Sequence, residues 1–174
     1  MSNLVTVVIH SYNRYEYLSN AIKSVLNQTM DDYEIILIND ESTDERYYKN
    51  NFGKKVKQID IRRNKNPRWT GSRQALINIG IENANGKYIA LLDDDDLWLE
   101  KKLELQIGEM ENNYYKFSST EGYFGLGKYS DKEQYPLYNT EHFAKVLKKK
   151  YRYTKYLKRG NLPKVWTEDF LKIH

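Results

Sequence analysis

An uncharged apolar run that ends in four consecutive carboxylates constrains the fold of this chain more than any other stretch. Residues 88–92 read Tyr-Ile-Ala-Leu-Leu, and Asp93–Asp96 follow them directly. A short run without internal charge, preceded by a turn, is typical of a buried and parallel strand. Open α/β sheets bind their ligands at the carboxyl ends of the strands. The sequence therefore predicts an acidic site at one edge of a sheet.

The acidic run has two interpretations. Adjacent like charges repel, and oxygen ligands suit a hard cation such as Mg²⁺ or Mn²⁺, which would in turn hold a phosphate. Alternatively, the run is a solvated loop in which Asp96 caps the next helix. The other apolar runs of the chain help to choose between them.

Strand and helix patterns alternate along the first two thirds of the chain. The apolar runs at residues 4–9, 33–38 and, more weakly, 54–61 predict further strands. Apolar residues at helical spacing predict helices after the runs at residues 4–9, 54–61 and 88–92, the last helix from about Leu97 to Asn112. We expect Asn13 to cap the first helix, and Asn85-Gly86 to form a left-handed cap on the helix that opens at Gly71-Ser72. This alternation predicts an α/β fold with a mostly parallel sheet.

Composition narrows the class of protein. The chain has 174 residues, which fits one domain. It contains no cysteine, which excludes disulfides and thiolate metal sites and favours a reducing compartment. Without an apolar signal or a run of about 20 apolar residues, we expect a soluble, cytoplasmic protein.

The basic charge lies in the last third of the chain. Residues 1–113 carry 15 Lys and Arg against 18 Asp and Glu, whereas residues 114–174 carry 13 against 6. Nine of the 16 tyrosines also lie between Tyr114 and Tyr156. This pattern fits nucleic acid, an anionic membrane surface, carbohydrate or an ordinary solvated surface. We expect no nucleic-acid partner, and peripheral membrane contact through the tail stays open.

Three stretches resemble the successive signatures of the family 2 glycosyltransferases with the GT-A fold. They are residues 5–14 (VTVVIHSYNR), 33–44 (YEIILINDESTD) and 86–98 (GKYIALLDDDDLW), in matching order and spacing over roughly residues 4–110. The resemblance implies a Rossmann-like, mostly parallel central sheet flanked by helices. It also implies a single catalytic domain over residues 1–174. Residues 1–112 would form its nucleotide-sugar half, and residues 113–174 an acceptor-side half that ends sooner than in typical members.

The resemblance also implies an activity. Such enzymes move a hexosyl or deoxyhexosyl group, with inversion, from a nucleotide-diphosphate sugar to a hydroxyl of a glycan or glycoprotein acceptor. We expect a UDP-sugar donor and Mn²⁺ or Mg²⁺ as the cofactor.

Residue by residue, the resemblance assigns donor-binding roles at the ends of the strands. Tyr12 would border the base, Asp40 would hydrogen-bond it, and Arg73 would approach the nucleotide. The other residues assigned to the donor are Ser11, Asn13, Arg14, Asp93 and Asp94. In the DxD element, Asp93 or Asp94 would face the ribose, and Asp95, with Asp93, would hold the metal.

The catalytic base is where the chain departs from the family. Inversion requires a carboxylate that takes the acceptor proton, and the available Glu-Asp pair late in the chain is Glu168-Asp169. Its surroundings resemble a helix start more than a catalytic loop, so a base beyond His174 is the alternative. His10 stands where the family usually has Pro, either packed or touching the base or ribose.

Three other functions compete with this interpretation. One is a sugar nucleotidyltransferase, which would show a Gly-rich phosphate loop near the first strand. Another is a nucleotide-sugar-binding module without its own base. The third is RNA binding by the tail, which would be steeply salt-dependent.

Overall fold

The computed structural model describes residues 4–62, 73–120, 122–123, 130 and 132–135. The chain divides into two compact units, the first ending at Leu105 and the second beginning at Gln106. The division of the chain into donor and acceptor halves stays a prediction.

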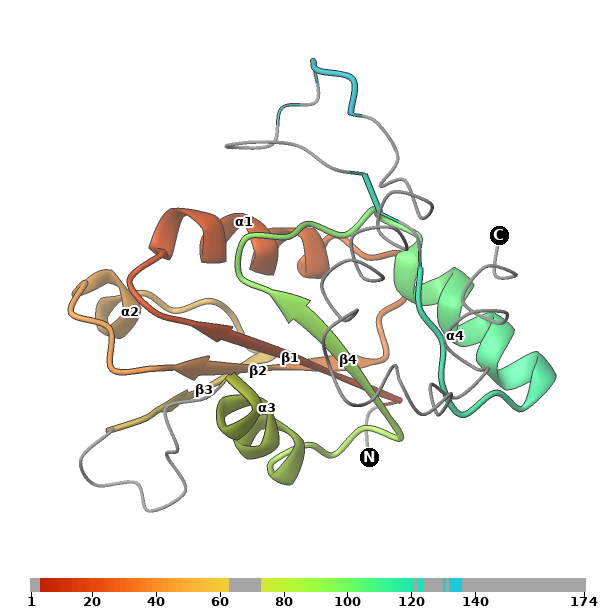
Figure 1. Cartoon of the computed structure of the whole chain (residues 1–174), viewed down its shortest axis with the longest axis horizontal. Helices are drawn as coiled ribbons and strands as arrows, with labels where there is room; N and C mark the ends of the chain where they lie inside the picture. The colour runs from red at the N-terminus through yellow and green to blue at the C-terminus, as the bar shows by residue number, and fades with distance from the viewer. Residues whose placement is uncertain (1–3, 63–72, 121, 124–129, 131, 136–174) are drawn as a thin grey trace, which may run out of the picture. The chain divides into compact units, whose positions relative to one another are not determined.

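The first unit is built around four parallel strands in the order β3-β2-β1-β4. Figure 1 shows α1 and α3 on opposite faces of this sheet. The expected α/β fold with a parallel sheet is confirmed. The elements in chain order are β1 (Val5–Ser11), α1 (Tyr15–Leu26), β2 (Tyr33–Asn39), α2 (Arg46–Lys49), β3 (Val56–Asp60), α3 (Arg73–Glu82), β4 (Tyr88–Asp93) and α4 (Lys102–Asn113).

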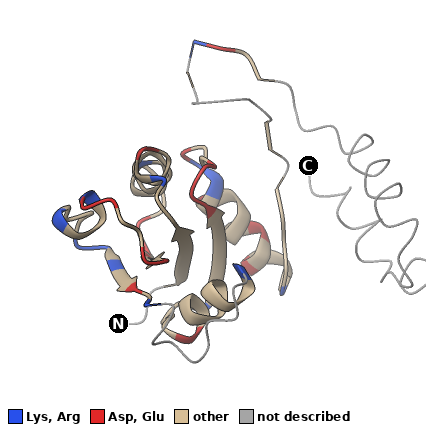
Figure 2. Ribbon diagram, turned by 60° about the vertical axis from the view of Figure 1, so that its left-hand side comes forward, with Lys and Arg blue, Asp and Glu red and all other residues tan. Residues whose placement is uncertain are grey.

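β1 lies at the centre of the sheet, where β2 pairs with one of its edges and β4 with the other. Val7 and Ile9 on one face of β1 are fully buried and Val8 on the other face is 2% exposed, as an apolar strand covered on both faces requires. Charged residues lie mainly on the loops and helices around it (Figure 2). The chain runs from β1 outward to β3 and returns to β4, so the strand order reverses between β1 and β4. That reversal is where open α/β sheets form their ligand crevice.

α3 packs closely on the sheet because one of its residues is glycine. A Cβ on Gly80 would lie 2.3 Å from Cγ1 of Val8 in β1. Close approach also explains Gly86, where a Cβ would lie 2.4 Å from the backbone nitrogen of Thr6. The expected left-handed cap at Gly86 is wrong, because its φ lies outside the left-handed region. The core beneath α3 contains Ile36, Ile38, Ile61, Leu76 and Ile79.

α4 begins later than the sequence predicted, at Lys102 instead of about Leu97. The buried Gln28 side chain, which follows α1, accounts for the difference. Its Nε2 donates to the carbonyl of Leu99 at 2.8 Å, and its Oε1 accepts from the amide of Leu103 at 2.9 Å. The first bond uses a carbonyl outside the helix, and the second supplies the cap for the helix start. Tertiary hydrogen bonds thus override the local helical pattern.

None of the helices in the described ranges is long and apolar enough to cross a membrane.

We predict that Gly80→Ala destabilises the protein by about 1–3 kcal/mol. Alanine normally favours a helix over glycine by about 1 kcal/mol, but here the new methyl group meets the stiff, β-branched Val8. Urea unfolding followed by circular dichroism measures the change. Gly108→Ala in α4 is the matched control, because a Cβ there meets nothing within 4 Å. Equal or greater stability of Gly80→Ala would contradict the packing argument.

Candidate active site

A buried hydrogen bond joins the carboxyl ends of β1 and β4. The strands pair in parallel up to His10 opposite Asp93, so the next residues, Ser11 and Asp94, lie side by side. Ser11 Oγ donates to Asp94 Oδ2 at 2.6 Å, and the two residues are 1% and 3% exposed. A carboxylate is therefore held below the surface, where it needs partners.

Tyr47 of α2 completes this buried group. Its hydroxyl lies 2.5 Å from Ser11 Oγ and accepts from the backbone N–H of Arg14 at 3.0 Å. Because Ser11 gives its one proton to Asp94, the Tyr47 hydroxyl donates to Ser11. The Tyr47 ring is 1% exposed and packs edge-on against Tyr15. A rigid aromatic side chain thus orients the serine that holds Asp94.

The Arg14 guanidinium bridges two of the four acidic residues. It donates to Asp94 Oδ1 at 3.0 Å and to Asp95 Oδ2 at 2.5 Å. Arg14 and Asp95 are both partly exposed, whereas Asp94 is buried. The bridge therefore runs from the buried carboxylate to one at the surface.

A second arginine lies against the first residue of the acidic run. Arg73, at the start of α3, forms an ion pair with Asp93. The amide of Asp96 donates to the carbonyl of Asp93 at 3.1 Å, which closes a turn over the acidic run. Because α4 begins only at Lys102, Asp96 does not cap it. The part of the solvated-loop interpretation in which Asp96 caps the next helix is therefore wrong.

Asn13 connects the loop after β1 to the loop after β2. Its φ is 50°, a conformation that asparagine tolerates better than most residues. Its side-chain Oδ1 accepts from the backbone N–H of Thr43 at 2.8 Å, and its backbone N–H donates to Ser42 Oγ at 3.0 Å. The expectation that Asn13 caps α1 is wrong, because Arg14 occupies the cap position and makes no side-chain cap bond. The Asn13 side chain bonds the neighbouring loop instead.

Two further predicted donor residues lie at the same edge. Asp40 follows β2, is 6% exposed, and donates its amide to the carbonyl of Ser11 at 3.0 Å. Tyr12 follows β1 and is 44% exposed. The edge thus combines a surface aromatic ring with carboxylates from two strands.

His10 is the second-last residue of β1 and pairs with Asp93, the first residue of the acidic run. Its Nε2 is buried and makes no hydrogen bond with the described residues. Burial of the ring, followed by the nearby Arg73 charge, lowers the His10 pKa below 6.5, although Asp93, Asp94 and Asp40 oppose the shift. We therefore expect a neutral imidazole at pH 7.

Burial acts on Asp94 in the opposite sense. It raises the pKa of the Asp94 carboxyl above its usual 3.8, while the Ser11 hydrogen bond and the Arg14 charge limit the rise. The two partners thus favour the ionised form in a place where burial disfavours it.

The structure brings most of the predicted donor residues to one edge of the first unit. Glu168 and Asp169 lie outside the described residues, as does the tail from residue 136 onward. Sequence reasoning missed Tyr47, whose side chain touches both Ser11 and Arg14. It lies in a short polar stretch without apolar periodicity, so no local pattern marks it.

The carboxylates of Asp93 and Asp95 could supply part of the coordination shell of a metal ion. Among the described residues, no group of three or more acidic or histidine side chains is placed to hold an ion. Mg²⁺ is, however, often held by only one or two carboxylates together with substrate phosphates. Asp93 and Asp95 each give one oxygen to an arginine, which leaves each carboxylate a second oxygen. These residues fit a cation that arrives with a diphosphate.

The first unit is thus an open, parallel α/β domain with acids at its topological switch point. The chain belongs to the Glycosyl transferase family 2, which matches residues 6–166.

Curated relatives are longer than this chain. A Rickettsia bellii protein named "Uncharacterized glycosyltransferase" is 45% identical over 116 residues, which are 67% of this chain and 16% of that protein. The Escherichia coli UDP-Glc:alpha-D-GlcNAc-diphosphoundecaprenol beta-1,3-glucosyltransferase WfgD is 35% identical over 117 residues, 66% of this chain and 44% of its own length. The chain spans less than half of both proteins.

The S. aureus protein TarS (residues 1–349), solved in complex with UDP-GlcNAc, has a similar fold. The TM-score is 0.53 at 19% identity, covering 63% of this chain and 32% of that one. This likeness concerns the fold alone. Together with the family match, it confirms the expected GT-A type fold.

We predict that Tyr47→Phe lowers the free energy of unfolding by about 1–3 kcal/mol. Loss of the hydroxyl leaves the Arg14 amide without its acceptor and Ser11 without its donor. Urea unfolding measures the effect. Tyr48→Phe is the matched control, because that hydroxyl donates to the Ser42 carbonyl in a more exposed place and should matter less. Equal effects of the two changes would contradict the role given to Tyr47.

We predict that stability falls on acidification from pH 7.5 to 5.5, and that His10→Gln reduces this fall. A folded-state pKa below 6.5 means that the unfolded chain takes up the proton first, so stability rises with pH through this window. Urea midpoints at both pH values test the sign. The other two histidines are present in both proteins and cancel in the comparison. Parallel pH profiles of wild type and variant would exclude His10 as the source.

Proposed function

We propose that this chain is the catalytic domain of an inverting, metal-dependent glycosyltransferase. It transfers a sugar from a UDP-sugar to a hydroxyl of a glycan or glycoprotein. The observation that carries the proposal is the linked group at the β1 and β4 ends, in which Ser11 and Arg14 hold Asp94 and Arg14 reaches Asp95. It presents surface carboxylates at the switch point of a family 2 domain.

The donor would lie along the carboxyl edge of the sheet. Asp40 would hydrogen-bond the uracil, with the exposed Tyr12 ring against it. Asp93 would face the ribose, because Asp94 is buried and already bonded to Ser11 and Arg14. The names of two similar proteins support UDP: WfgD is described with UDP-Glc, and TarS was solved with UDP-GlcNAc.

Asp95, with Asp93, would hold Mn²⁺ or Mg²⁺. Bound there with the diphosphate, the ion would stabilise the negative charge that develops on the leaving group. Arg14 forms an ion pair with Asp95 and Arg73 forms one with Asp93, so both arginines are also placed to approach the phosphates.

The base would deprotonate the acceptor hydroxyl on the opposite side of the sugar, a step worth about 10²–10⁴-fold in rate. We assign it to Asp169 or Glu168 on the sequence pattern alone. A nucleotide-sugar-binding module without a base is the alternative. Transfer or hydrolysis of UDP-glucose by the protein distinguishes the two.

We predict that UDP with Mn²⁺ raises the melting temperature of the protein more than UDP alone, because binding to the folded state stabilises it by mass action. Asp95→Ala should abolish the Mn²⁺-dependent part of the shift. A differential scanning fluorimetry titration measures both effects.

Asp31→Ala is the matched control, because Asp31 is an exposed aspartate in the loop before β2 and pairs with Lys55. It should keep the full shift. A Mn²⁺-dependent shift that survives in Asp95→Ala would refute the metal assignment.

A further inference from the structure

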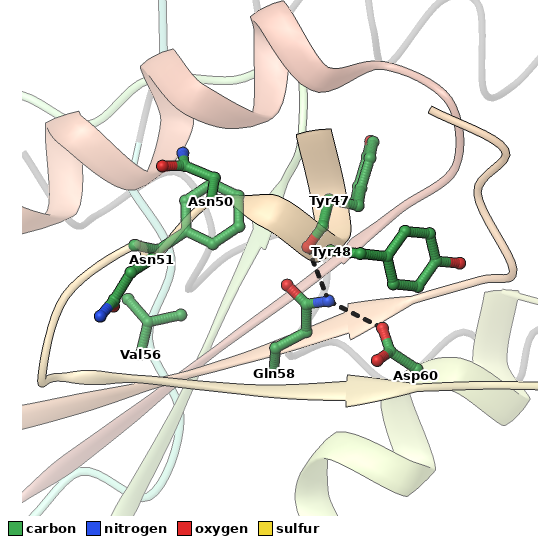
Figure 3. Close-up of a pocket in the computed structure, with 8 residues that line it drawn as sticks. Tyr47, Tyr48, Asn50, Asn51, Val56, Gln58 and Asp60 are labelled. Carbon is green, nitrogen blue, oxygen red and sulfur yellow. Dashed lines mark hydrogen bonds between the residues drawn. The ribbon is translucent and has the colours of Figure 1, made fainter. Parts of the chain in front are cut away.

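A pocket of about 300 Å³ lies on the first unit between α2 and β3 (Figure 3). None of the predicted donor or metal residues lines it. Its volume is at the lower end of the range of small-molecule sites, about 300–1,000 Å³. The pocket therefore suits a ligand smaller than a nucleotide sugar.

Fixed hydrogen-bond acceptors line one wall of this pocket. Gln58 Nε2 donates to the Tyr47 carbonyl at 3.0 Å and to Asp60 Oδ1 at 2.7 Å, as the dashed lines in Figure 3 show. Both amide hydrogens are thereby used, which leaves the carbonyl oxygen Oε1 as the group that can bind a ligand. Asn39 Nδ2 also donates to Asp60 Oδ1 at 2.8 Å. Neither Gln58 Oε1 nor Asp60 Oδ2 accepts a hydrogen bond from another described residue.

Aromatic and amide side chains form the rest of the lining. Tyr48 is 54% exposed, Phe52 is half-buried, and Asn50 adds a further amide. Among the residues that the structure describes, no lysine or arginine lines the pocket, so this described lining lacks the cations that bind phosphate or carboxylate groups. Its chemistry combines oriented acceptors for hydroxyl groups with apolar ring surface.

We propose that this pocket binds a single ring of a neutral saccharide. The sugar hydroxyls would donate to Gln58 Oε1 and Asp60 Oδ2, and an apolar sugar face would lie on an aromatic ring. If the proposed transferase function holds, the pocket would retain a remote part of a glycan and raise its effective concentration near the donor edge. Saccharide binding itself does not depend on that function.

The test is an NMR titration of the full chain with methyl β-D-glucopyranoside, following the side-chain amide signals of Asn50, Asn51 and Gln58. We expect saturable shifts at millimolar concentration. Gln58→Ala should weaken binding about three- to tenfold, the cost of one hydrogen bond. Tyr48→Ala, at a partly exposed position, should also weaken it, and the Gln58 hydrogen bonds run to the Tyr47 carbonyl and to Asp60 and not to the Tyr48 side chain.

Lys57→Ala is the matched control, because Lys57 precedes Gln58 on the same strand and points to the other face. It should bind the glucoside as wild type does. No saturable shift in wild type, equal binding by Gln58→Ala and wild type, or a preference of these signals for UMP over the glucoside would overturn the proposal. Asp95→Ala should still bind the glucoside, because Asp95 does not line this pocket. A failure of the proposed donor site can therefore be told apart from a failure of the proposed saccharide pocket.

Discussion

The hydrogen bond from Ser11 to Asp94 is the interaction on which the candidate site depends. A carboxylate that is 3% exposed would be costly without partners. Here one oxygen is held by a serine and the other by a guanidinium. Leaving a buried acceptor without a partner typically costs about 1–3 kcal/mol, so the Asp94 carboxylate depends on the contacts that Ser11 and Arg14 make to it. Tyr47 orients the serine, and Arg14 connects the buried acid to the exposed Asp95.

The sheet topology explains why these residues meet. β1 and β4 are far apart in sequence but adjacent and parallel, so their following residues emerge at one edge. β2 adds Asp40 to that edge, and Asn13 fixes the distance between the first two loops through its bond to Thr43. The loops therefore constrain one another, which is what a preorganised binding edge requires.

The sequence predicted the positions of β1, β2 and β4, because each is a short apolar run bounded by polar residues. The expected burial of β4 is wrong: it is the end strand of the described sheet, and its Ile89 and Leu91 are 38% and 51% exposed. The sequence also predicted that Asp93–Asp96 follow a strand, and the family resemblance led to the correct fold. It failed where long-range hydrogen bonds decide the local structure. Asn13 bonds the next loop instead of capping α1, and Gln28 delays the start of α4 to Lys102. Tyr47 could not be found at all, because only the folded sheet brings its hydroxyl to Ser11.

The pairing of arginines with the acidic turn has a consequence for the order of assembly. Within the acidic turn itself, the four carboxylates of Asp93–Asp96 and the guanidinium groups of Arg14 and Arg73 leave two negative charges, the amount that one divalent ion would cancel. The two arginines thus act as internal counter-ions that offset part of the repulsion among these carboxylates, so the turn does not need a metal ion in order to fold. If the proposed cation binds at this turn, a chelator such as EDTA would remove it and leave the polypeptide in its native conformation.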